Sequence, residues 1–556
     1  MTAGLSRRGL AYAALIAAAG SVLAAVGDDY ALRVATLVGI YAIAAIGFQL
    51  VFGRLGLLAL SQGALFGVGA YALALATVQG GWPPLAGLAL SVAVPALAGA
   101  LVAIPVARLD SHYVALATLG LAQLVLLAVT NLEITGGANG LYGIPPLTVL
   151  GVDLADGWQM LAVVWSGVAL ALACFAWVIG AGRGGRLATL RDAPLAALSL
   201  GLDPARARLL VFAVAGALAG LAGALQALGL GVVSPAVARF DVMVTLLAVV
   251  VVGGRGSAWG AVVAAMLLVP LPEVFRGLEQ AYLLAYGVML LAAVVALPTG
   301  IDGVVRRFLP DLPAPTPPPA APKSRKISVL RVERIAKHFG GVQALDGAGF
   351  DARAGEVTGI IGANGSGKTT LLNIVTGLET ADAGVVRLDA IPLLDLKPGA
   401  RAALGLARGF QHPEVPAGID VLTAVSVAAG PAAGMAALDR VGLADRARAP
   451  ATALGPAARR RLDIARALAA GPSVLLLDEP ASGLSASERT DLARLLRDLA
   501  ATGMAIVVVE HGMDFLLPIA DRLVCLEAGR VLAAGRTDDV RRDPAVIASY
   551  LGEEPA

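Results

Sequence analysis

The first 310 residues contain no lysine and consist of long apolar stretches separated by short loops. A membrane-spanning helix needs about 20 mostly apolar residues, and the sequence supplies about ten such segments. We predict them near residues 9–26, 34–52, 57–78, 84–106, 113–130, 158–180, 209–229, 240–252, 257–275 and 280–298. The whole chain of 556 residues is 58% hydrophobic and 15% charged, which excludes an ordinary soluble protein. These segments therefore predict a polytopic α-helical membrane domain.

The arginines in the loops indicate how the spans are oriented. If the N-terminus is cytoplasmic, nearly all of these arginines fall on the cytoplasmic side, and Arg33, Arg239 and Arg276 are the exceptions. Because basic residues favour the cytoplasmic side, we expect both ends of the domain there. Arg7 and Arg8 before the first apolar segment are also typical of a cleaved signal peptide, but the spans that follow favour an uncleaved first helix.

A proline-rich stretch, PDLPAPTPPPAAPKSRK, separates two parts of different composition. Its prolines favour an extended spacer over a packed element. We expect a membrane domain over 1–308, a linker over 309–326 and an α/β domain over 327–556. The net charge of +2 gives no reason to expect nucleic acid as a partner. Cys174 and Cys525 would lie in different compartments, so no disulfide is expected.

Two loops of the membrane domain have unusual sequences. Residues 131–146, NLEITGGANGLYGIPP, are rich in glycine and lack basic residues, so we expect a structured extracytoplasmic loop for docking or gating. Residues 183–208 are expected on the cytoplasmic side, as a short amphipathic helix that ends at Gly201. A helix held on the cytoplasmic face is suited to act as a lever for an attached motor domain.

The predicted spans are rich in glycine and alanine, as in GALFGVGAYALALA, and small residues allow helix backbones to approach closely in lipid. Gln49, Gln62 and Gln123 are polar groups inside these spans. They either line a path for a polar substrate or form hydrogen bonds between helices.

The fragment VTGIIGANGSGKTTLLNIVTG contains the spacing GxxxxGK[ST] directly after a β-branched run at 357–361. In this context backbone N–H groups and a helix N-terminus cradle phosphates, Lys368 meets the β and γ oxygens, and Thr369 binds Mg²⁺. The candidate nucleotide-binding residues are Gly362, Ala363, Asn364, Gly365, Ser366, Gly367, Lys368, Thr369 and Thr370. The motif therefore predicts ATP and Mg²⁺ as cofactors.

A second motif, SVLLLDEP, is typical of a buried strand that ends in two acids. Asp478 is placed to hold the Mg²⁺ ion, and Glu479 is placed to polarise the attacking water in phosphoryl transfer. Two adjacent acids mean little alone, but together with the phosphate-binding loop they predict an ATPase.

The membrane half carries YAIAAIGFQLVFGRLGLLALSQGALFGVGAYA, TGGANGL, ALSLGLDPARARLLVFAVAGALAGLAGAL and VVGGRGSAWGAVVAA. These runs resemble the permease of branched-chain amino acid importers in the ATP-binding cassette (ABC) superfamily, over most of residues 30–300. The resemblance implies that the loop around Ala193 to Gly201 is the coupling helix seated on an ATPase. Gln62 stands where relatives usually carry a histidine, which is a departure from the family pattern.

The second half carries RGFQ, VVVEH, SGLS and DPAVIASYLG. They resemble the Q-loop, H-loop, D-loop and C-terminus of the ATPase subunits of the same family, over residues 327–552. The resemblance implies that Gln411 binds Mg²⁺ and senses the membrane domain, and that Glu479 and His511 are catalytic, with His511 at the γ-phosphate. It also implies that Phe339 stacks on adenine, with a plain core position as the alternative.

The signature motif of cassette ATPases, LSGGQ or similar, is altered here. At the equivalent positions, before RRRLDIARAL, the chain has Leu454, Gly455, Pro456, Ala457 and Ala458. Gly455 has no hydroxyl, Pro456 has no N–H, and Ala457 adds a Cβ where close approach favours glycine. Proline is accepted in the first turn of a helix, so we expect the helix to form and the phosphate contact to weaken. This predicts a dimer in which the chain's P-loop pairs with the signature of a different ATPase.

The two resemblances together predict a fusion of one permease and one ATPase. The expected function is ATP-driven import of branched-chain or related amino acids across the bacterial inner membrane, with the ATPase in the cytoplasm. The expected partners are a second permease, a second ATPase, an extracytoplasmic solute-binding protein, the small-molecule substrate and membrane lipid. The alternatives are an importer of urea, short amides or aromatic or carboxylic acids, and, from another class, an ATP-gated channel or membrane-bound regulator.

Overall fold

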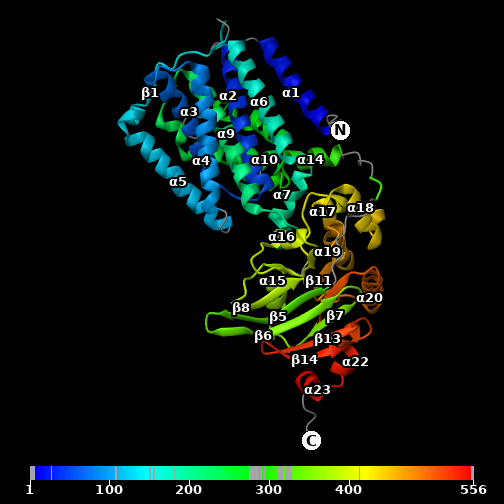
Figure 1. Ribbon diagram of the computed structural model, residues 1–556. Coiled ribbons are helices and arrows are strands. Elements are labelled where there is room, and N and C mark those ends of the chain that lie inside the picture. Colours follow the sequence, from blue (N-terminus) through cyan, green and yellow to red (C-terminus); the bar gives the residue numbers. More distant parts are fainter. Residues whose placement is uncertain are drawn as a thin grey trace. The chain divides into compact units, whose positions relative to one another are not determined.

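The computed structural model describes residues 7–26, 28–106, 109, 111–149, 152–154, 157–180, 182–274, 287–288, 291–292, 295–309, 317–319, 329–411 and 413–551. The chain divides into two compact units (Figure 1). The first comprises Met1–Gly180 and Pro204–Pro313, and the second comprises Ala181–Asp203 and Ala314–Ala556. Most of the predicted linker, 309–326, lies outside the described residues.

The described part of the first unit consists mainly of helices. Its α-helices are α1 (Arg7–Val26), α2 (Asp29–Phe48), α3 (Gln62–Ala74), α4 (Pro84–Val106), α5 (Ser111–Asn131), α6 (Gly157–Ile179), α9 (Pro204–Leu230), α10 (Phe240–Gly253), α11 (Ala258–Leu268), α12 (Leu271–Val274) and α14 (Gly300–Phe308). By length and composition, five described helices can cross a membrane: Asp29–Arg54, Pro84–Val106, Tyr113–Asn131, Gly157–Ile179 and Pro204–Leu230. The first nine predicted spans contain helix, and the tenth, 280–298, lies largely outside the described residues.

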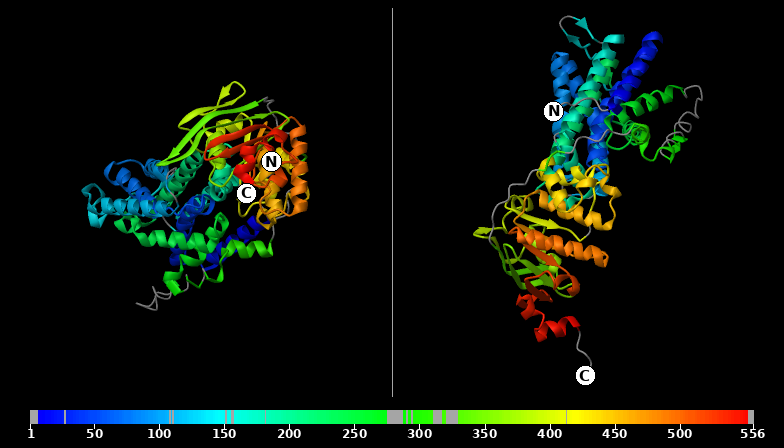
Figure 2. Two further views of the ribbon diagram at one scale, coloured as in Figure 1. Left: turned by 90° about the horizontal axis from the view of Figure 1, so that it is seen from below. Right: turned by 90° about the vertical axis from the view of Figure 1, so that its right-hand side faces the viewer.

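Helices of the first unit run side by side (Figure 2). Helix α9 contacts α2, α3 and α4, and glycines lie at its closest contacts with them. A Cβ built on Gly220 would lie 2.1 Å from the carbonyl oxygen of Ser91, and one built on Gly223 would lie 1.9 Å from that of Phe66. Both separations are far below van der Waals contact. Glycine at these positions therefore allows the helix backbones to approach closely. In lipid, such close packing takes the place of the hydrophobic effect as the force that drives helices together.

Two of the three span glutamines form hydrogen bonds between segments of the first unit. The Gln49 Nε2 donates to the carbonyls of Val250 (3.2 Å) and Gly254 (2.9 Å), and its Oε1 accepts from the Gly256 N–H. The Gln62 Nε2 donates to a carbonyl of α9 at 2.9 Å. Both side chains are buried, so of the two sequence-based alternatives, packing by hydrogen bonds holds for Gln49 and Gln62. Gln123 on α5 is exposed.

Residues 131–146 form an ordered loop, as the sequence predicts. After two 3₁₀ turns, strand β1 (Leu141–Tyr142) pairs antiparallel with β4 (Val232–Val233), which follows α9. Gly140 has φ +78°, and a Cβ there would lie 2.0 Å from the Val233 carbonyl oxygen. A side chain would therefore prevent the loop from closing on β4. A short hairpin, β2 (Thr148–Val149) and β3 (Val152–Asp153), follows.

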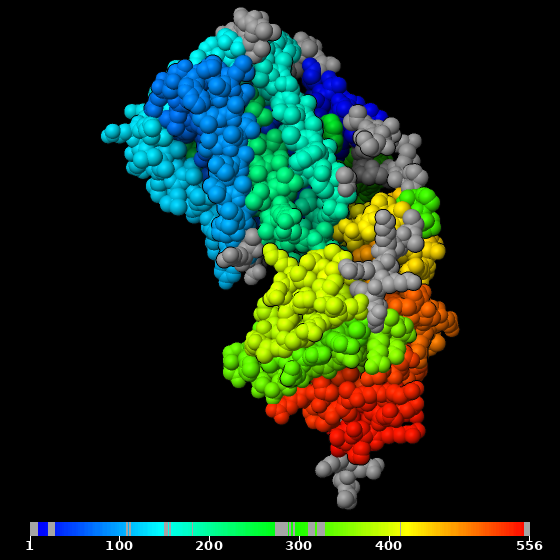
Figure 3. Space-filling model, viewed as in Figure 1, coloured from blue at the N-terminus to red at the C-terminus, as the bar shows by residue number. Residues whose placement is uncertain are grey.

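The second unit contains two sheets. The larger has the order β10-β11-β12-β7-β13-β14, with β7 (Val357–Ile361), β10 (Leu406–Gly409), β11 (Val474–Asp478), β12 (Ala505–Val509), β13 (Arg522–Glu527) and β14 (Arg530–Arg536). Its strands are parallel except β14. The smaller, antiparallel sheet has the order β6-β5-β8-β9, and its strands β5 and β6 form the green surface of this unit in Figure 3. Its bounds are β5 (Val329–Phe339), β6 (Val342–Arg353), β8 (Ala383–Leu388) and β9 (Ile391–Pro392).

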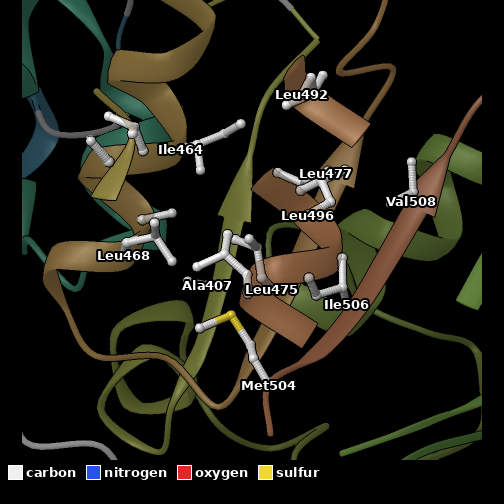
Figure 4. Close-up of a cluster of buried hydrophobic side chains, with 14 of the residues drawn as sticks. Ala407, Ile464, Leu468, Leu475, Leu477, Leu492, Leu496, Met504, Ile506 and Val508 are labelled. Atoms are coloured by element: carbon white, nitrogen blue, oxygen red, sulfur yellow. The ribbon is translucent and has the colours of Figure 1, made fainter. Parts of the chain in front are cut away.

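Strands β7, β11 and β12 are buried along their whole length, and apart from Thr358 and the terminal Asp478 their residues are apolar. Alternate side chains of β11 serve different cores. Leu475 and Leu477 pack with Ile464 and Leu468 of α19 and with α20 (Figure 4), whereas Leu476 packs with the cluster around α15. The sheet is thereby held between helices on both faces, and the carboxyl ends of its parallel strands meet at one edge.

The helices of the second unit are α7 (Arg183–Asp192), α8 (Pro194–Ser199), α15 (Lys368–Thr376), α16 (Pro398–Ala403), α17 (Val421–Ser426), α18 (Pro431–Arg440), α19 (Pro456–Ala469), α20 (Ala486–Ala501), α21 (Met513–Leu516), α22 (Thr537–Val540) and α23 (Pro544–Leu551). An apolar helical part followed by an α/β part confirms the predicted fold class. The single helix predicted at 183–208 is wrong in detail, because α7 ends before Pro194, α8 ends before Gly201, and Pro204 begins α9. Ala193, which precedes proline, has φ −144°, outside the helical region.

Candidate nucleotide site

The predicted phosphate-binding loop connects β7 to α15, at the carboxyl edge of the larger sheet. Gly362, Gly365 and Gly367 have φ of +154°, +82° and +97°. A Cβ on Gly362 would lie 2.2 Å from the Leu526 carbonyl oxygen, so glycine is required there for close packing as well as for conformation. The first residues of α15 are Lys368, Thr369 and Thr370, so these side chains begin the helix that follows the loop.

The Lys368 ammonium is held by the loop itself. Its Nζ donates to the carbonyls of Gly362 and Ala363, each at 2.8 Å, and lies 3.5 Å from the Ser366 hydroxyl. Burial lowers the pKa of this lysine, and the nearby acids Glu479 and Asp478 oppose that effect. The loop therefore presents a positive charge where a helix N-terminus also favours phosphate. Asn364 of the same loop is exposed.

Asp478 is the last residue of β11 and forms a buried ion pair with Arg408 of β10. The Arg408 Nη2 donates to Asp478 Oδ2 at 3.0 Å, and both side chains are 3% exposed. The other oxygen, Oδ1, is buried and has no hydrogen-bond partner among the described residues. Burial raises the pKa of Asp478 although Arg408 opposes this.

The unpaired Oδ1 fits a magnesium ion bound together with a nucleotide. Mg²⁺ in nucleotide sites binds one or two carboxylates plus substrate phosphates and keeps several waters. In the described part of the chain no group of three or more His, Cys, Asp or Glu side chains could hold a metal by itself. The unpaired Oδ1 is the observation that supports Asp478 as a ligand, and the assignment of Thr369 and Gln411 as further ligands stays a prediction.

Three predicted residues from different segments meet at one carboxylate. The Gln411 Nε2 donates to Glu479 Oε2 at 2.5 Å, and the His511 Nε2 lies 3.0 Å from the same oxygen. Gln411 follows β10, Glu479 follows β11 and His511 lies two residues after β12. Because these strands are neighbours and parallel, their carboxyl ends bring the three side chains together.

Glu479 has a strained backbone. Its φ of +47° lies in the left-handed region, which costs a non-glycine residue roughly 1 to 3 kcal/mol. The conformation is held by a hydrogen bond from its N–H to the Val509 carbonyl at 2.9 Å. The chain therefore turns sharply after Asp478, and Asp478 and Glu479 serve different partners although they are adjacent.

Phe339 ends β5 and is 47% exposed, so it is not a core residue. The Lys337 Nζ lies 5.1 Å from its ring centroid. An exposed aromatic ring in the cassette is available for stacking, and the contact with adenine stays a prediction.

The altered signature opens α19, as expected from proline in a first helical turn. Gly455 is the N-cap residue with φ −70° and ψ 170°, and Pro456 is the first residue of the helix. Leu454 is buried, whereas a Cβ built on Gly455 would have no described heavy atom within 4 Å. A hollow of about 390 Å³ lies at the start of this helix. It is lined by Gly455, Pro456, Ala457 and Ala458, by residues of the segment 442–446, and by Arg461 and Glu488.

Sequence reasoning missed the connection between α19 and the segment that carries Gln411. The Arg460 Nη1 donates to the carbonyls of Phe410 (2.8 Å) and Gln411 (2.7 Å). Asp463 accepts from the Phe410 N–H at 2.8 Å and pairs with Arg466, which also donates to the Glu414 carbonyl. These charged residues are buried, and charges in the otherwise apolar face of RRRLDIARAL are the signal that was available. The helix and this segment are therefore tied together.

Helices α7 and α8 pack on the cassette within the second unit. The Asp192 carboxylate accepts from the Ala417 N–H at 2.8 Å, and Arg191 donates to the Ala417 carbonyl at 3.3 Å. Ala193 is fully buried between the two helices. Gly201 (φ +83°) lies close to α16, because a Cβ built on it would be 3.4 Å from the Gly399 Cα. The predicted coupling loop therefore contacts the segment just after Gln411, and Arg191 and Asp192, which precede the predicted range, make the polar contacts.

From the coupling role that the family resemblance implies, we expect Asp192→Ala to uncouple transport from ATP hydrolysis. The substitution removes the acceptor for the Ala417 N–H and the partner of Arg191, a loss of about 1.5 to 3 kcal/mol for a hydrogen bond to a charged group. In proteoliposomes, uptake per ATP hydrolysed should fall by about tenfold or more. Asp192→Asn keeps an oxygen acceptor and should recover part of the coupling, and Asp241→Ala, at an exposed acid of α10, serves as the control. Unchanged stoichiometry in Asp192→Ala would contradict the role.

Comparison with known proteins finds family matches in both halves of the chain. Residues 30–295 match the branched-chain amino acid transport system/permease component family. Residues 345–482 match the ABC transporter family, and residues 530–556 match the branched-chain amino acid ATP-binding cassette transporter family. The second half is 32% identical over 250 residues to the high-affinity branched-chain amino acid transport ATP-binding protein LivG of Salmonella typhimurium, covering 40% of this chain and 98% of that protein. The chain belongs to the ABC transporter family.

Other ATP-binding proteins match a similar share of this ABC transporter chain. A putative ribose/galactose/methyl galactoside import ATP-binding protein of Burkholderia ambifaria is 34% identical over 232 residues, or 40% of this chain and 44% of that protein. The chain thus spans about half the length of such relatives. A crystal structure of the ADP conformation of an ATP-binding cassette of an ABC transporter is 30% identical, with a TM-score of 0.38 over 41% of this chain and 100% of that one.

Proposed function

We propose that this ABC transporter chain uses ATP to import branched-chain or related amino acids, supplying one permease and one ATPase to a larger complex. ATP binds at the P-loop residues Gly362 to Thr370, with adenine on Phe339. Mg²⁺ is held by Thr369, Gln411 and Asp478. Glu479 polarises the attacking water, and His511 contacts the γ-phosphate.

The observation that carries this proposal is the contact of α7 and α8 with the cassette. Residues 183–199 lie inside the sequence that matches the permease family, yet they pack within the compact unit of the ATPase. Asp192 and Arg191 form hydrogen bonds with Ala417. Ala417 lies six residues after Gln411, whose side chain donates to Glu479. A change at the nucleotide therefore has a short bonded path to a helix pair of the permease sequence, which is what a coupled transporter requires.

The permease match and the similarity to LivG support the proposed substrate class. ATP-binding proteins named for ribose/galactose and for methionine import match this chain at similar identity, so the permease match is the observation that favours amino acids among these substrates. Urea, short amides and aromatic or carboxylic acids are the competing substrates. An extracytoplasmic solute-binding protein would deliver the solute, and the ordered loop 131–146 is the candidate docking site.

The altered signature favours a complex with a second permease and a second, different ATPase. In a cassette dimer each P-loop faces the signature of the opposite subunit. A pair of identical chains would place the segment Leu454 to Ala458 in both sites. A partner with an intact signature would complete one strong site around this chain's P-loop.

Uptake measured in proteoliposomes tests the function. We expect the chain, reconstituted with its partner subunits and the binding protein, to accumulate radiolabelled leucine inside vesicles only when Mg²⁺ and ATP are supplied on the cassette side. Accumulation above the external concentration distinguishes a pump from an ATP-gated channel, which only equilibrates the solute. Ligand binding by the solute-binding protein, measured with leucine, urea, an aromatic acid and ribose, ranks the substrates. Accumulation of urea, an aromatic acid or ribose instead of leucine would contradict the amino-acid assignment.

A further inference from the structure

Arg408 is a buried arginine whose guanidinium joins the two nucleotide motifs of the cassette. It lies on β10, three residues before Gln411, and is buried. Its Nη2 bonds Asp478 Oδ2 at 3.0 Å, and its Nη1 bonds Asn373 Oδ1 of α15 at 2.5 Å and lies 3.4 Å from the Thr376 hydroxyl. One side chain therefore connects the helix that follows the P-loop with the acid that ends β11.

The orientation of Arg408 leaves one Asp478 oxygen available. Oδ2 is occupied by the guanidinium, and Oδ1 is buried without a hydrogen-bond partner in the part of the chain that the structure describes. The Lys368 ammonium is engaged with two loop carbonyls, so Arg408 makes the ion pair with Asp478. The anchors on α15 fix the guanidinium, which in turn fixes the plane and rotamer of the carboxylate.

We propose that Arg408 is a positioning residue, which holds the Asp478 carboxyl group in the orientation in which its unpaired oxygen receives the magnesium ion of the bound nucleotide. The inference rests on the proposed function, because it assumes that the cassette binds Mg²⁺ and ATP. Without Arg408, the Asp478 carboxyl group loses the hydrogen bond that fixes its plane, so it is free to rotate and Oδ1 no longer points steadily toward the cation position.

Arg401 provides a matched control. It is also a buried arginine, 3% exposed, and its Nη1 donates to the carbonyls of Ile374 and Val375 in the same helix α15. Its hydrogen bonds go to backbone carbonyls, and the nearby acid that acts on it is Asp395, which lies outside the nucleotide site. A substitution at Arg401 therefore disturbs the support of α15 without touching Asp478.

The experiment measures binding of a fluorescent ATP analogue by the full chain in nanodiscs, first in EDTA and then during titration with MgCl₂. In EDTA we expect wild type, Arg408→Met and Arg401→Met to bind the analogue within about threefold of one another. The Mg²⁺ concentration at the midpoint should rise by about 10- to 100-fold in Arg408→Met, which corresponds to the loss of a charge-assisted hydrogen bond, and by less in Arg408→Lys, which keeps the charge. Arg401→Met should lower the melting temperature and leave the midpoint unchanged.

A double-substitution cycle identifies the path of the effect. If Arg408 acts through Asp478, the Arg408→Met/Asp478→Asn variant should have the same Mg²⁺ midpoint as Asp478→Asn. A midpoint of Arg408→Met within about threefold of wild type, or an equal shift in Arg401→Met, overturns the inference while the proposed function stands. Failure of wild type to bind the analogue at any Mg²⁺ concentration overturns the proposed function and the inference with it. Arg408→Lys gives a second, milder variant if Arg408→Met does not fold.

Discussion

Glu479→Gln is expected to abolish ATP hydrolysis and to leave ATP binding intact. The substitution keeps the size of the side chain and the hydrogen bond donated by Gln411, but it removes the negative charge that polarises water. General-base groups typically contribute about 10²- to 10⁴-fold to a rate, so kcat should fall by at least about two orders of magnitude. The change is measured as phosphate release by the reconstituted complex, with nucleotide affinity measured in parallel.

The control for this variant is Glu527→Gln. Glu527 ends β13 of the same sheet, is exposed and accepts from the Ser549 hydroxyl, so it carries the same chemical change away from the cluster of Gln411, Glu479 and His511. Its hydrolysis rate should stay within about twofold of wild type. Hydrolysis by Glu479→Gln at the wild-type rate would show that another group activates the water.

Restoring the signature is expected to activate the chain when it dimerises with itself. The triple substitution Gly455→Ser, Pro456→Gly and Ala457→Gly returns the hydroxyl, the N–H and the glycine that the segment lacks. The structure accommodates the change, because Gly455 already has N-cap geometry and open space around its Cβ position. A serine N-cap stabilises the helix start by only a few tenths of a kcal/mol relative to glycine, and each glycine in the first turn costs up to about 1 kcal/mol, so we expect the start of α19 to be slightly less stable but still formed.

The measurement is ATPase activity of the chain alone and of the chain mixed with its partner ATPase. Alone, the restored chain should hydrolyse ATP about 10- to 100-fold faster than wild type, as expected for regained hydrogen bonds to a charged phosphate. In the mixture with the partner ATPase, the restored chain and the wild-type chain should have nearly equal ATPase activity. The reason is that this chain's P-loop then uses the partner's signature in both cases. Vigorous hydrolysis by the unaltered chain alone would refute the proposed asymmetry between the two sites.

Features encoded by neighbouring residues were predictable from the sequence. The apolar segments need only their own length and composition to indicate helices in a membrane. The phosphate-binding loop needs only its glycines, Lys368 and the strand before it. Asp478 and Glu479 are adjacent and end a strand that is recognisably apolar. Each signal is contained within about 20 residues, the length of one span or one strand-loop-helix unit.

Prediction from local sequence was wrong where the chain changes direction over a short distance. The sequence of residues 183–208 is amphipathic, and its periodicity favoured one helix. Pro194 and Pro204 divide it into α7, α8 and the start of α9, because proline removes a backbone donor and restricts the residue before it. For Gln49 and Gln62 the sequence left two alternatives. A glutamine in a span can form a hydrogen bond with a neighbouring helix or line a substrate path, and the sequence is the same in both cases.

Local patterns were enough to predict that this chain joins an apolar helical part to a cassette with a P-loop, an acid pair and an altered signature. Which of these groups act on one another depends on the folded arrangement. Arg408 contacts Asp478, which lies 70 residues away in the sequence. Glu479 is contacted by Gln411, 68 residues before it, and by His511, 32 residues after it. Asp192 contacts Ala417 across 225 residues. These contacts depend on the order of parallel strands in the sheet and on the packing of α7 and α8. No local pattern specifies them, because hydrogen bonds between distant segments exist only after the apolar cores have brought those segments together.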